Sequence, residues 1–320
     1  MSESTTLGVE RLRPKLLAVA YRMLGTAADA EDAVQDAYLR YHQYAAEVES
    51  SEGWLVRTTT RLCIDRLRAA KREEYVGQWL PEPVPESWAG AAADRTELAE
   101  SLSTAFLVLL ETLSPAERAT HVLREAFGYE FDEIAGLLDT TPVNVRQIAS
   151  RARKRLGTRE RRFDPPPGAA DELAARFFAA CQSGDVGAIE AMLAADVTLV
   201  SDGGGKAFAA RHPVVGVRKV ANLLAVVFRK LRAVGEAELT TVNGGPGVVF
   251  TVAGRPVEVI TLAVDGPSVS RLYVTLNPDK LSRWPANGTG GGDGSDRPGP
   301  WERKNDGTAP ELHEADPGAS

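Results

Sequence analysis

The sequence has little cysteine, with Cys63 and Cys181 as the two examples in 320 residues. They lie far apart, and neither belongs to a Cys-x-x-Cys pair or a Cys/His cluster. A disulfide framework and a structural zinc site both need several such residues at short spacing. The sequence therefore predicts a chain in a reducing cytosol, without disulfides, bound metal or another cofactor.

The chain also lacks an apolar signal core near its N-terminus and any apolar run long enough to cross a bilayer. We therefore expect a soluble, cytoplasmic protein with no membrane contact. Its hydrophobic share of 43% and charged share of 25% are ordinary globular values. The length suits two or three domains.

A net positive charge is absent too, since 37 Lys and Arg stand against 44 Asp and Glu, a balance of −7. The charge is unevenly distributed, however. Residues 146–162 contain eight Arg or Lys and one acid, Glu160. Phosphate groups respond to local charge. The acidic total therefore does not exclude a nucleic-acid-binding surface.

Residues 131–156 predict two short helices joined by a tight turn. Asp139 to Thr141 interrupts the helical pattern, Thr141 suits a helix cap, and Pro142 suits a first helical position. The second helix has an apolar face at i, i+3, i+4, i+7 and i+11. Its other face carries the candidate DNA contacts Asn144, Arg146, Gln147, Ser150, Arg151, Arg153 and Lys154. The pattern favours a helix-turn-helix whose second helix enters the major groove, with an ordinary helix pair and a solvated basic face as the alternative.

Residues 7–75 also predict helices. The helix expected at 28–41 carries Asp29, Asp32 and Asp36 beside an apolar face. Acids near a helix N-terminus stabilise it through the helix dipole. An acidic docking face for a basic protein partner explains them equally well.

The helix expected at 54–73 carries a basic stripe, with Ile64 in the same sector. The stripe consists of Arg57, Arg61, Arg68 and Arg72. With Trp54 and Tyr44 nearby, it suits contact with a nucleic-acid backbone and stacking on an unpaired base. A solvated cationic face is the alternative.

Residues 76–97 are expected to form a linker, because their prolines and glycines exclude a long helix. Trp79, Leu80 and Trp88 are too apolar for a free tether, so we expect this linker to dock on another surface. A helix at 98–113 and a capping box at Ser114 follow.

After a proline-rich boundary, residues 168–283 predict a third domain. Helices come first, then a short strand at 197–201, a glycine turn at 202–206, a helix at 217–232 and four strands from 237 to 276. Helices followed by antiparallel strands predict a cone-shaped α+β fold. Residues 284–320 are rich in Gly, Pro, Asp and Ser and are expected to be disordered.

Segments 27–43, 53–72 and 113–156, in this order, resemble the extracytoplasmic-function RNA polymerase sigma factors. The resemblance implies two all-α domains, a sigma-2 domain at 7–75 that reads the −10 promoter element and a sigma-4 helix-turn-helix domain at 98–159 that reads the −35 element. It implies promoter DNA and the polymerase core as partners, the latter through the clamp and flap regions of its large subunits. The implied core-binding residues are Asp29, Asp32, Gln35 and Asp36.

Three further motifs, WLPEP at 79–83, DGGGK at 202–206 and NPDKL at 277–281, resemble sigma factors of the SigJ type with a fused SnoaL-like domain. The resemblance implies a C-terminal α+β SnoaL-like cone that contacts the linker within the same chain and tunes activity in cis. The implied regulatory residues are Trp79, Leu80, Pro81, Glu82, Pro83, Asp202, Gly203, Gly204, Gly205, Lys206, Asn277, Pro278, Asp279, Lys280 and Leu281.

SnoaL-like folds also include small-molecule enzymes, so a catalytic or ligand-sensing C-terminal domain fused to a DNA-binding regulator is the alternative function. Its candidate pocket residues are Asp202, Lys206, His212, Glu258 and Tyr273. An acid–base pair needs groups within reach of a substrate and a shifted pKa, and the sequence shows neither. We expect no enzyme and no catalytic residue. A plain DNA-binding regulator that never joins polymerase is a further alternative.

Overall fold

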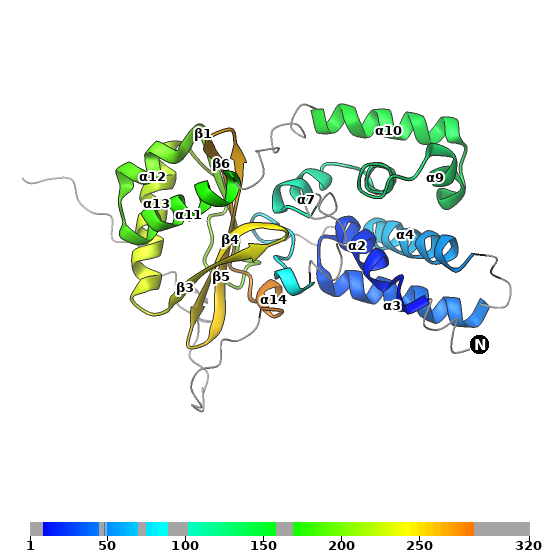
Figure 1. The fold of residues 1–320 in the computed structure, drawn as a ribbon, viewed down its shortest axis with the longest axis horizontal. Helices are drawn as coiled ribbons and strands as arrows, with labels where there is room; N and C mark the ends of the chain where they lie inside the picture. The colour runs from blue at the N-terminus through cyan, green and yellow to red at the C-terminus, as the bar shows by residue number, and fades with distance from the viewer. Residues whose placement is uncertain are drawn as a thin grey trace, which may run out of the picture.

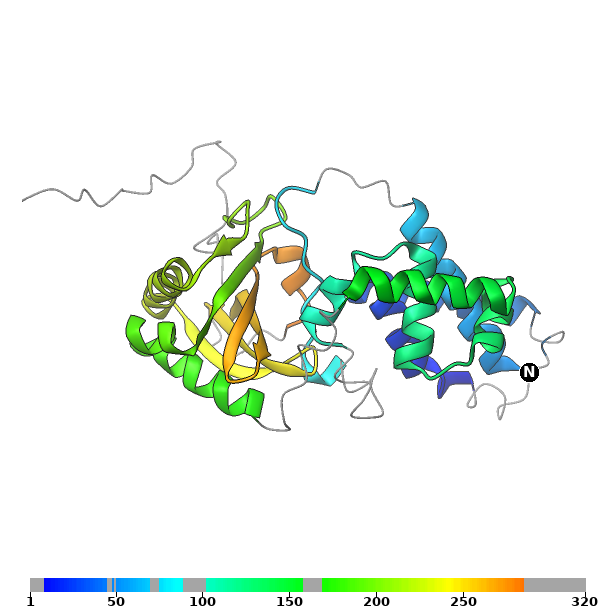
Figure 2. The same cartoon turned by 90° about the horizontal axis from the view of Figure 1, so that it is seen from above.

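The computed structural model describes residues 9–44, 48, 50–69, 75–88, 102–157 and 169–284. Figures 1 and 2 show a helical half, built from the N-terminal segments, beside a half that contains a β-sheet. The linker residues 75–88 run between the two halves.

The first helical module consists of α2 (Arg13–Leu24), α3 (Ala27–Tyr44) and α4 (Ser51–Ala69), which pack on one another. Gly25 ends α2 in a left-handed conformation with φ of +76°, which glycine adopts without strain. Thr26 then caps α3 by accepting a hydrogen bond from Asp29 N at 3.2 Å. Helix α3 is longer than the predicted 28–41.

The second helical module consists of α7 (Thr104–Leu110), α8 (Pro115–His121), η2 (Val122–Ala126), α9 (Phe131–Leu138) and α10 (Pro142–Leu156). The predicted capping box at the start of α8 is confirmed, because Ser114 and Glu117 exchange both hydrogen bonds. Element η2 continues α8 as a short π-helix. The helix predicted at 98–113 is shorter, and residues 98–101 lie outside the described part of the chain.

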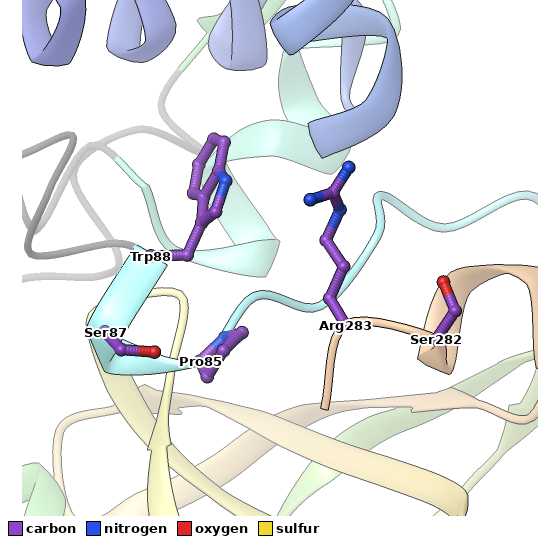
Figure 3. A pocket seen from close by; sticks show the side chains of 5 residues that line it. All are labelled: Pro85, Ser87, Trp88, Ser282 and Arg283. Atoms are coloured by element: carbon purple, nitrogen blue, oxygen red, sulfur yellow. The ribbon is translucent and has the colours of Figure 1, made fainter. Parts of the chain in front are cut away.

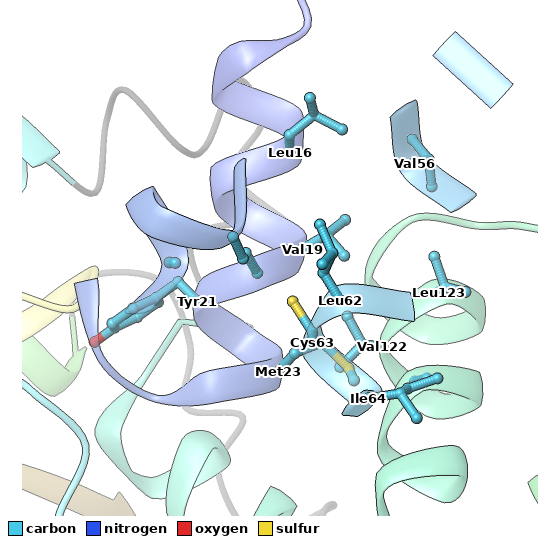
Figure 4. Packing of buried hydrophobic residues seen from close by; sticks show 14 of the residues in the cluster. Leu16, Val19, Tyr21, Met23, Val56, Leu62, Cys63, Ile64, Val122 and Leu123 are labelled. Atoms are coloured by element: carbon cyan, nitrogen blue, oxygen red, sulfur yellow. The ribbon is translucent and has the colours of Figure 1, made fainter. Parts of the chain in front are cut away.

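The two helical modules share one apolar cluster (Figure 4). Leu62 and Ile64 of α4 belong to the same cluster as Val122 and Leu123 of η2. Helix α2 contributes Leu16 to the cluster. The modules are therefore packed together rather than merely tethered.

The C-terminal half begins with α11 (Ala169–Ser183) and α12 (Val186–Met192), and α13 (Val217–Arg232) follows later in the chain. Its six-stranded sheet has the order β2-β1-β6-β5-β4-β3. The strands are β1 (Leu193–Asp202), β2 (Val214–Val215), β3 (Glu236–Val242), β4 (Gly245–Val252), β5 (Arg255–Asp265) and β6 (Ser268–Thr275). Strand β1 starts earlier than predicted and pairs in parallel with β6, so the sheet is mixed rather than wholly antiparallel.

The two faces of this sheet have different neighbours (Figure 1). Helices α11, α12 and α13 cover one face through a cluster that includes Phe177 and Phe228. The other face packs against the linker, α7 and α14 (Pro278–Leu281), with Leu80 and Ala105 buried beside Ala263 and Tyr273. The second face thereby joins the sheet to the helical modules.

Candidate functional site

Helix α10 presents its predicted polar face to solvent. Thr141 caps the helix by accepting a hydrogen bond from Asn144 N at 3.2 Å, and Pro142 occupies the first turn. The predicted apolar face of α10 is buried against the rest of the module. The exposed residues are the seven candidate DNA contacts Asn144, Arg146, Gln147, Ser150, Arg151, Arg153 and Lys154. Two of them form ion pairs within the module, Arg146 with Asp132 at 3.9 Å and Arg153 with Glu125 at 3.7 Å.

Two arginines of the basic stripe on α4 point at the other helical module. The guanidinium groups of Arg57 and Arg61 form ion pairs with the two carboxylate oxygens of Asp139, in the turn between α9 and α10. Burial and the neighbouring Arg57 lower the pKa of Arg61. Arg68 pairs with Asp65 of its own helix, and Arg72 lies outside the described residues.

The acidic face of α3 remains largely accessible. Asp29, Asp32 and Gln35 are exposed, whereas the Asp36 carboxylate binds Arg66 of α4 at 2.8 Å. Leu39, on the same helix, has 56% of its surface exposed. The accessible acids leave this face of α3 available to a basic partner.

The three motifs of the linker and the C-terminal half meet at Asp202. This carboxylate is fully buried and accepts hydrogen bonds from Tyr75 Oη at 2.5 Å, Leu80 N at 3.0 Å and Gly204 N at 3.0 Å. Lys280 Nζ lies 2.7 Å from its Oδ2 atom. A buried charge needs such full pairing, and here the partners come from the linker, the glycine turn and the NPDKL motif.

The Lys280 ammonium group binds the linker as well. It donates a hydrogen bond to the carbonyl oxygen of Leu80 at 2.5 Å and lies 4.4 Å from the ring centre of Trp79. Burial lowers the pKa of Lys280, and Asp202 opposes that shift. The linker is therefore held through backbone, charge and aromatic contacts.

A second ion pair lies at the surface and joins the DGGGK motif to the NPDKL motif. It links Lys206 Nζ with Asp279 at 2.5 Å. Both of its side chains are more than half exposed. The glycine turn beside it is tightly packed, since a Cβ on Gly204 would lie 2.3 Å from Asn277 Nδ2. Gly204 also has a φ of +57°, so glycine is required there on two grounds.

Glu82, in the WLPEP motif, completes the first turn of α3. Its Oε2 atom accepts a hydrogen bond from Ala27 N at 2.7 Å, and its Oε1 atom lies 3.0 Å from Arg283 Nε. Burial raises the pKa of Glu82 and outweighs these two favourable contacts. A carboxylate at this end of α3 also complements the helix dipole.

Asn243, which the sequence did not single out, joins four segments. Its backbone and side chain exchange hydrogen bonds with Val84 of the linker, at 3.0 and 2.7 Å. Its Nδ2 atom lies 3.1 Å from Tyr21 Oη of α2 and 3.5 Å from Thr104 Oγ1 of α7. An Asn-Gly pair between two strands is a hairpin signal, and the φ of +52° at Asn243 fits it.

Arg283 is another unpredicted contact. Its guanidinium group forms two hydrogen bonds with the Glu31 carboxylate of α3, at 2.9 and 2.8 Å. Trp88 Nε1 donates to the same carboxylate at 3.1 Å, and Figure 3 shows Trp88 and Arg283 on opposite sides of a pocket. Trp284, the first residue of the predicted tail, is buried with its Nε1 atom 3.0 Å from Pro83 O. Residues 285–320 lie outside the described residues.

The candidate catalytic residues are dispersed. Glu258 pairs across the strands with Phe250, on the face covered by helices, whereas Tyr273 packs with Leu80 on the opposite face. Asp202 is engaged by the linker, and His212 is exposed. The described structure therefore does not bring Glu258 and Tyr273 to one pocket, as the catalytic alternative would require.

Within the described residues, no group of three or more His, Cys, Asp or Glu side chains is placed to hold a metal ion. Cys63 and Cys181 are free and buried, and burial raises the pKa of each thiol to about 12. None of the described helices combines the length and apolarity needed to span a bilayer.

Comparisons with known proteins agree with this arrangement. Residues 9–73 match the family model for sigma-70 region 2, and residues 103–156 match that for sigma-70 region 4. The chain is 36% identical to the ECF RNA polymerase sigma factor SigJ of Mycobacterium tuberculosis, over 86% of this chain and 93% of that protein. It is 28% identical to the probable ECF RNA polymerase sigma factor SigI of the same organism, over 84% and 92% of the two chains.

The similarity extends to the three-dimensional arrangement. The crystal structure of the extracytoplasmic-function sigma factor SigJ of Mycobacterium tuberculosis matches with a TM-score of 0.72 and 33% identity, over 88% of this chain and 99% of that chain. The match therefore includes the sheet-containing half as well as both helical modules. On these grounds the chain belongs to the extracytoplasmic-function (ECF) RNA polymerase sigma factors.

Proposed function

We propose that this ECF sigma factor directs the RNA polymerase core to specific promoters and that its C-terminal domain tunes this activity in cis. The observation that carries the proposal is the solvent-exposed polar face of α10, presented by a capped helix-turn-helix in a chain of this family. Seven polar or basic residues lie on that face without burial.

Helix α10 is the proposed reader of the −35 element. Asn144, Arg146 and Gln147 lie in its first turns, and recognition helices contact base edges with their N-terminal residues. Ser150, Arg151, Arg153 and Lys154 lie further along the helix and suit phosphate contacts. Binding should weaken steeply with salt for this reason.

Helix α4 is the proposed reader of the −10 element, through Arg57, Arg61, Arg68 and Arg72. Its guanidinium groups suit the backbone of a melted strand, and Trp54 supplies an aromatic surface for an unpaired base. This role requires α4 to be accessible on the promoter.

Helix α3 is the proposed docking surface for the polymerase clamp, through Asp29, Asp32, Gln35 and Asp36. The support is the exposure of Asp29, Asp32 and Gln35 and the charge of the three carboxylates on this face. The second helical module is proposed to bind the flap region. Such a subunit acts where the polymerase acts, in the cytoplasm.

The C-terminal domain is proposed to hold the linker in place. It would thereby fix the relative position of the two DNA-reading modules. The support is the set of hydrogen bonds at Asp202, Lys280 and Glu82, which fasten WLPEP to both halves of the molecule. Side chains with buried, charge-assisted hydrogen bonds position a segment more firmly than apolar contact alone.

Transcription in vitro with purified core polymerase tests the proposal. The full chain should support initiation from matched promoters found by footprinting on genomic DNA, and removal of residues after Leu281 should change that activity. No core binding and no initiation from any promoter would refute it.

Charge reversal on α3 separates this function from that of a DNA-binding regulator that never joins polymerase. Asp32→Lys with Asp36→Lys should abolish core binding and leave duplex binding by α10 intact. The matched control reverses two exposed acids of the C-terminal domain, Asp196→Lys with Asp265→Lys. Equal core binding by the two double variants would favour the plain regulator, provided that both retain the thermal stability of the parent.

A ligand-sensing C-terminal domain is a second candidate, favoured by the buried carboxyl of Glu258. Burial raises its pKa to about 8, so much of it is protonated near neutral pH. A ligand that binds beside it should raise the melting temperature of the full chain and not that of Glu258→Gln. A broad screen without such a compound counts against this candidate.

A further inference from the structure

We propose that α10 reads A·T base pairs, with Val143 against the methyl group of a thymine and Gln147 hydrogen-bonded to an adenine. The inference rests on the proposed role of α10 as the reader of the −35 element, and it names the bases that are read. The seven predicted contacts on α10 are polar or basic, and Val143 is not among them.

The side chain of Val143 is turned toward solvent. Val143 is the second residue of α10, which lies at the outer edge of the helical half (Figure 1). It has 61% of its surface exposed, the largest fraction of any large apolar side chain in the described residues. A β-branched side chain lowers helix propensity, and an acid would stabilise the first turn better. An apolar contact outside the chain therefore explains valine here better than the helix does.

Four exposed side chains form a row along the outside of α10. They lie at i, i+4, i+7 and i+11, opposite the buried face of the helix. We call Val143, Gln147, Ser150 and Lys154 the outer row. Because the opposite face packs on the module, the outer row reaches deepest into a groove that the helix enters. Its first two members lie near the N-terminus of α10, the end of a recognition helix that contacts base edges.

The basic side chains on the flanks of the outer row are held by acids of the same module. Three ion pairs are formed there, Arg146 with Asp132 at 3.9 Å, Arg153 with Glu125 at 3.7 Å and Arg155 with Glu117 at 3.0 Å. The three arginine side chains remain more than half exposed. Exposed pairs of this kind exchange readily for DNA phosphates. The flanks therefore suit the backbone of the duplex, and the outer row suits its bases.

The two amide side chains of α10 differ in a similar way. Asn144 Nδ2 donates a hydrogen bond to Thr140 Oγ1 at 2.8 Å, which commits that amide to the turn. The side chain of Gln147 has no hydrogen bond to another described residue. Its amide offers one donor group and one acceptor, which complement the N7 acceptor and the N6 donor of adenine in the major groove. Guanine presents two acceptors at the same edge, so it does not match.

Thymine supplies the apolar partner of Val143. Its C5 methyl group projects into the major groove, and no other base of DNA carries a methyl group there. The distance between the two bases follows from helix geometry. Four residues advance α10 by about 6 Å, and base pairs are stacked about 3.4 Å apart along a strand. Val143 and Gln147 therefore reach bases about two steps apart or closer.

Base analogues in the bound duplex test each contact. The full chain, alone and with purified core polymerase, first selects duplexes from a random pool, and the selected −35 element is synthesised with single replacements. Uracil in place of thymine removes only the methyl group, and 7-deazaadenine in place of adenine removes the N7 acceptor. The protein variants are Val143→Ala and Gln147→Ala. Two exposed positions of the C-terminal half provide matched controls, Val215→Ala and Gln182→Ala.

At one thymine, uracil should weaken binding of the parent by about threefold to fivefold, which corresponds to one buried methyl group. The same replacement should leave binding of Val143→Ala unchanged. At one adenine, 7-deazaadenine should weaken the parent by about twofold to tenfold, as expected for one hydrogen bond, and should leave Gln147→Ala unchanged. Both controls should respond as the parent does. All four variants should keep the melting temperature of the parent, because the substituted side chains are exposed.

The inference is overturned if the parent tolerates every analogue, or if the two α10 variants respond to the analogues as strongly as the parent. Enrichment of no sequence from the pool, by the chain alone or with core, overturns it as well. A loss of core binding by Val143→Ala with an unchanged response to uracil would assign Val143 to a polymerase contact instead.

Transcription separates this result from the proposed function. Initiation from the selected promoter without a response to either analogue refutes the base assignment alone. Failure to bind core and to initiate refutes the proposed function, whichever analogues weaken duplex binding. Initiation together with both analogue responses supports the two proposals jointly.

Discussion

Two internal interfaces of this molecule differ in how far their charged side chains are buried. Between the linker and the sheet, Asp202 and Lys280 form an ion pair whose side chains are 0% and 8% exposed, and both bind the backbone of Leu80. Between the helical modules, Arg57 and Arg61 meet Asp139 with about half of each side chain in solvent. At the first interface the charges are buried, whereas the second combines exposed ion pairs with a shared apolar cluster and a buried hydrogen bond from Arg118 to Met23 O.

The difference indicates which parts move. A buried pair is costly to break, because each partner would be left as an unpaired buried charge. An exposed pair exchanges partners at little cost. The sheet and linker should therefore behave as one body, whereas the two helical modules depend on their shared apolar cluster more than on the ion pairs of Asp139.

The largest expected effect comes from Asp202→Asn. It leaves the Lys280 ammonium buried without a counter-charge, so the free energy of unfolding should fall by about 3–5 kcal/mol. Urea unfolding of the full chain measures this. Asp139→Asn, at the exposed ion pairs, is expected to cost about 1 kcal/mol or less. An equally small loss for Asp202→Asn would contradict the difference between buried and exposed pairs.

The linker side of the sealed interface is tested by Leu80→Ala. Leu80 is fully buried beside Ala105, Ala263 and Tyr273, so its truncation should cost about 2–5 kcal/mol. Combined with Trp79→Ala, it should also loosen the C-terminal half in small-angle scattering and change promoter activity. Leu239→Ala on β3, 49% exposed, is the control and should change stability by about 0.5 kcal/mol or less.

Glu258 lies in the interior of the sheet domain, away from both interfaces. It provides an independent measure of what burial does to a charged group. Its folded pKa of about 8 lies above the ordinary value of 4.5, so the folded chain retains a proton that the unfolded chain loses. This contribution to stability is complete below pH 4.5 and declines as the pH rises to about 8. Glu258→Gln should therefore raise the free energy of unfolding by about 4 kcal/mol at pH 8 and flatten its dependence on pH. If the free energy of unfolding of variant and parent depended on pH in the same way, Glu258 would not have a raised pKa. Glu236→Gln replaces an exposed acid and serves as the control.

The smallest effect is expected from Lys206→Met. Lys206 and Asp279 connect the same two motifs as Asp202 and Lys280, but their side chains are 56% and 61% exposed. Its cost should be about 0–1 kcal/mol and should vanish at high salt. A cost close to that of Asp202→Asn would mean that burial does not decide the strength of these pairs.

Local signals in the sequence account for much of this fold. Thr141 and Pro142 mark the start of α10, and the capping box at Ser114 marks the start of α8, because each depends on residues within one turn. Nothing within WLPEP, DGGGK or NPDKL specifies the other two motifs. Their contact could therefore be expected only from the family resemblance.

Long-range contacts were not predictable in this way. The parallel pairing of β1 with β6 joins strands that are far apart in the chain, and a strand pattern does not specify its partner. Glu82 as a cap for α3, and Arg283 as a partner of Glu31, are side-chain contacts between distant segments. One signal was present and unused, because Ile64 in a basic stripe indicates that the stripe packs against another surface.

The hairpin tip at Asn243 ties the sheet to both helical modules. It binds Tyr21 of the first helical module and Thr104 at the start of α7, and Thr261 Oγ1 of β5 lies 3.1 Å from the same threonine hydroxyl. The beginning of the second module is thereby pinned to the sheet, while α8 to α10 beyond it are not. A substitution at Asn243 should therefore affect both helical modules at once.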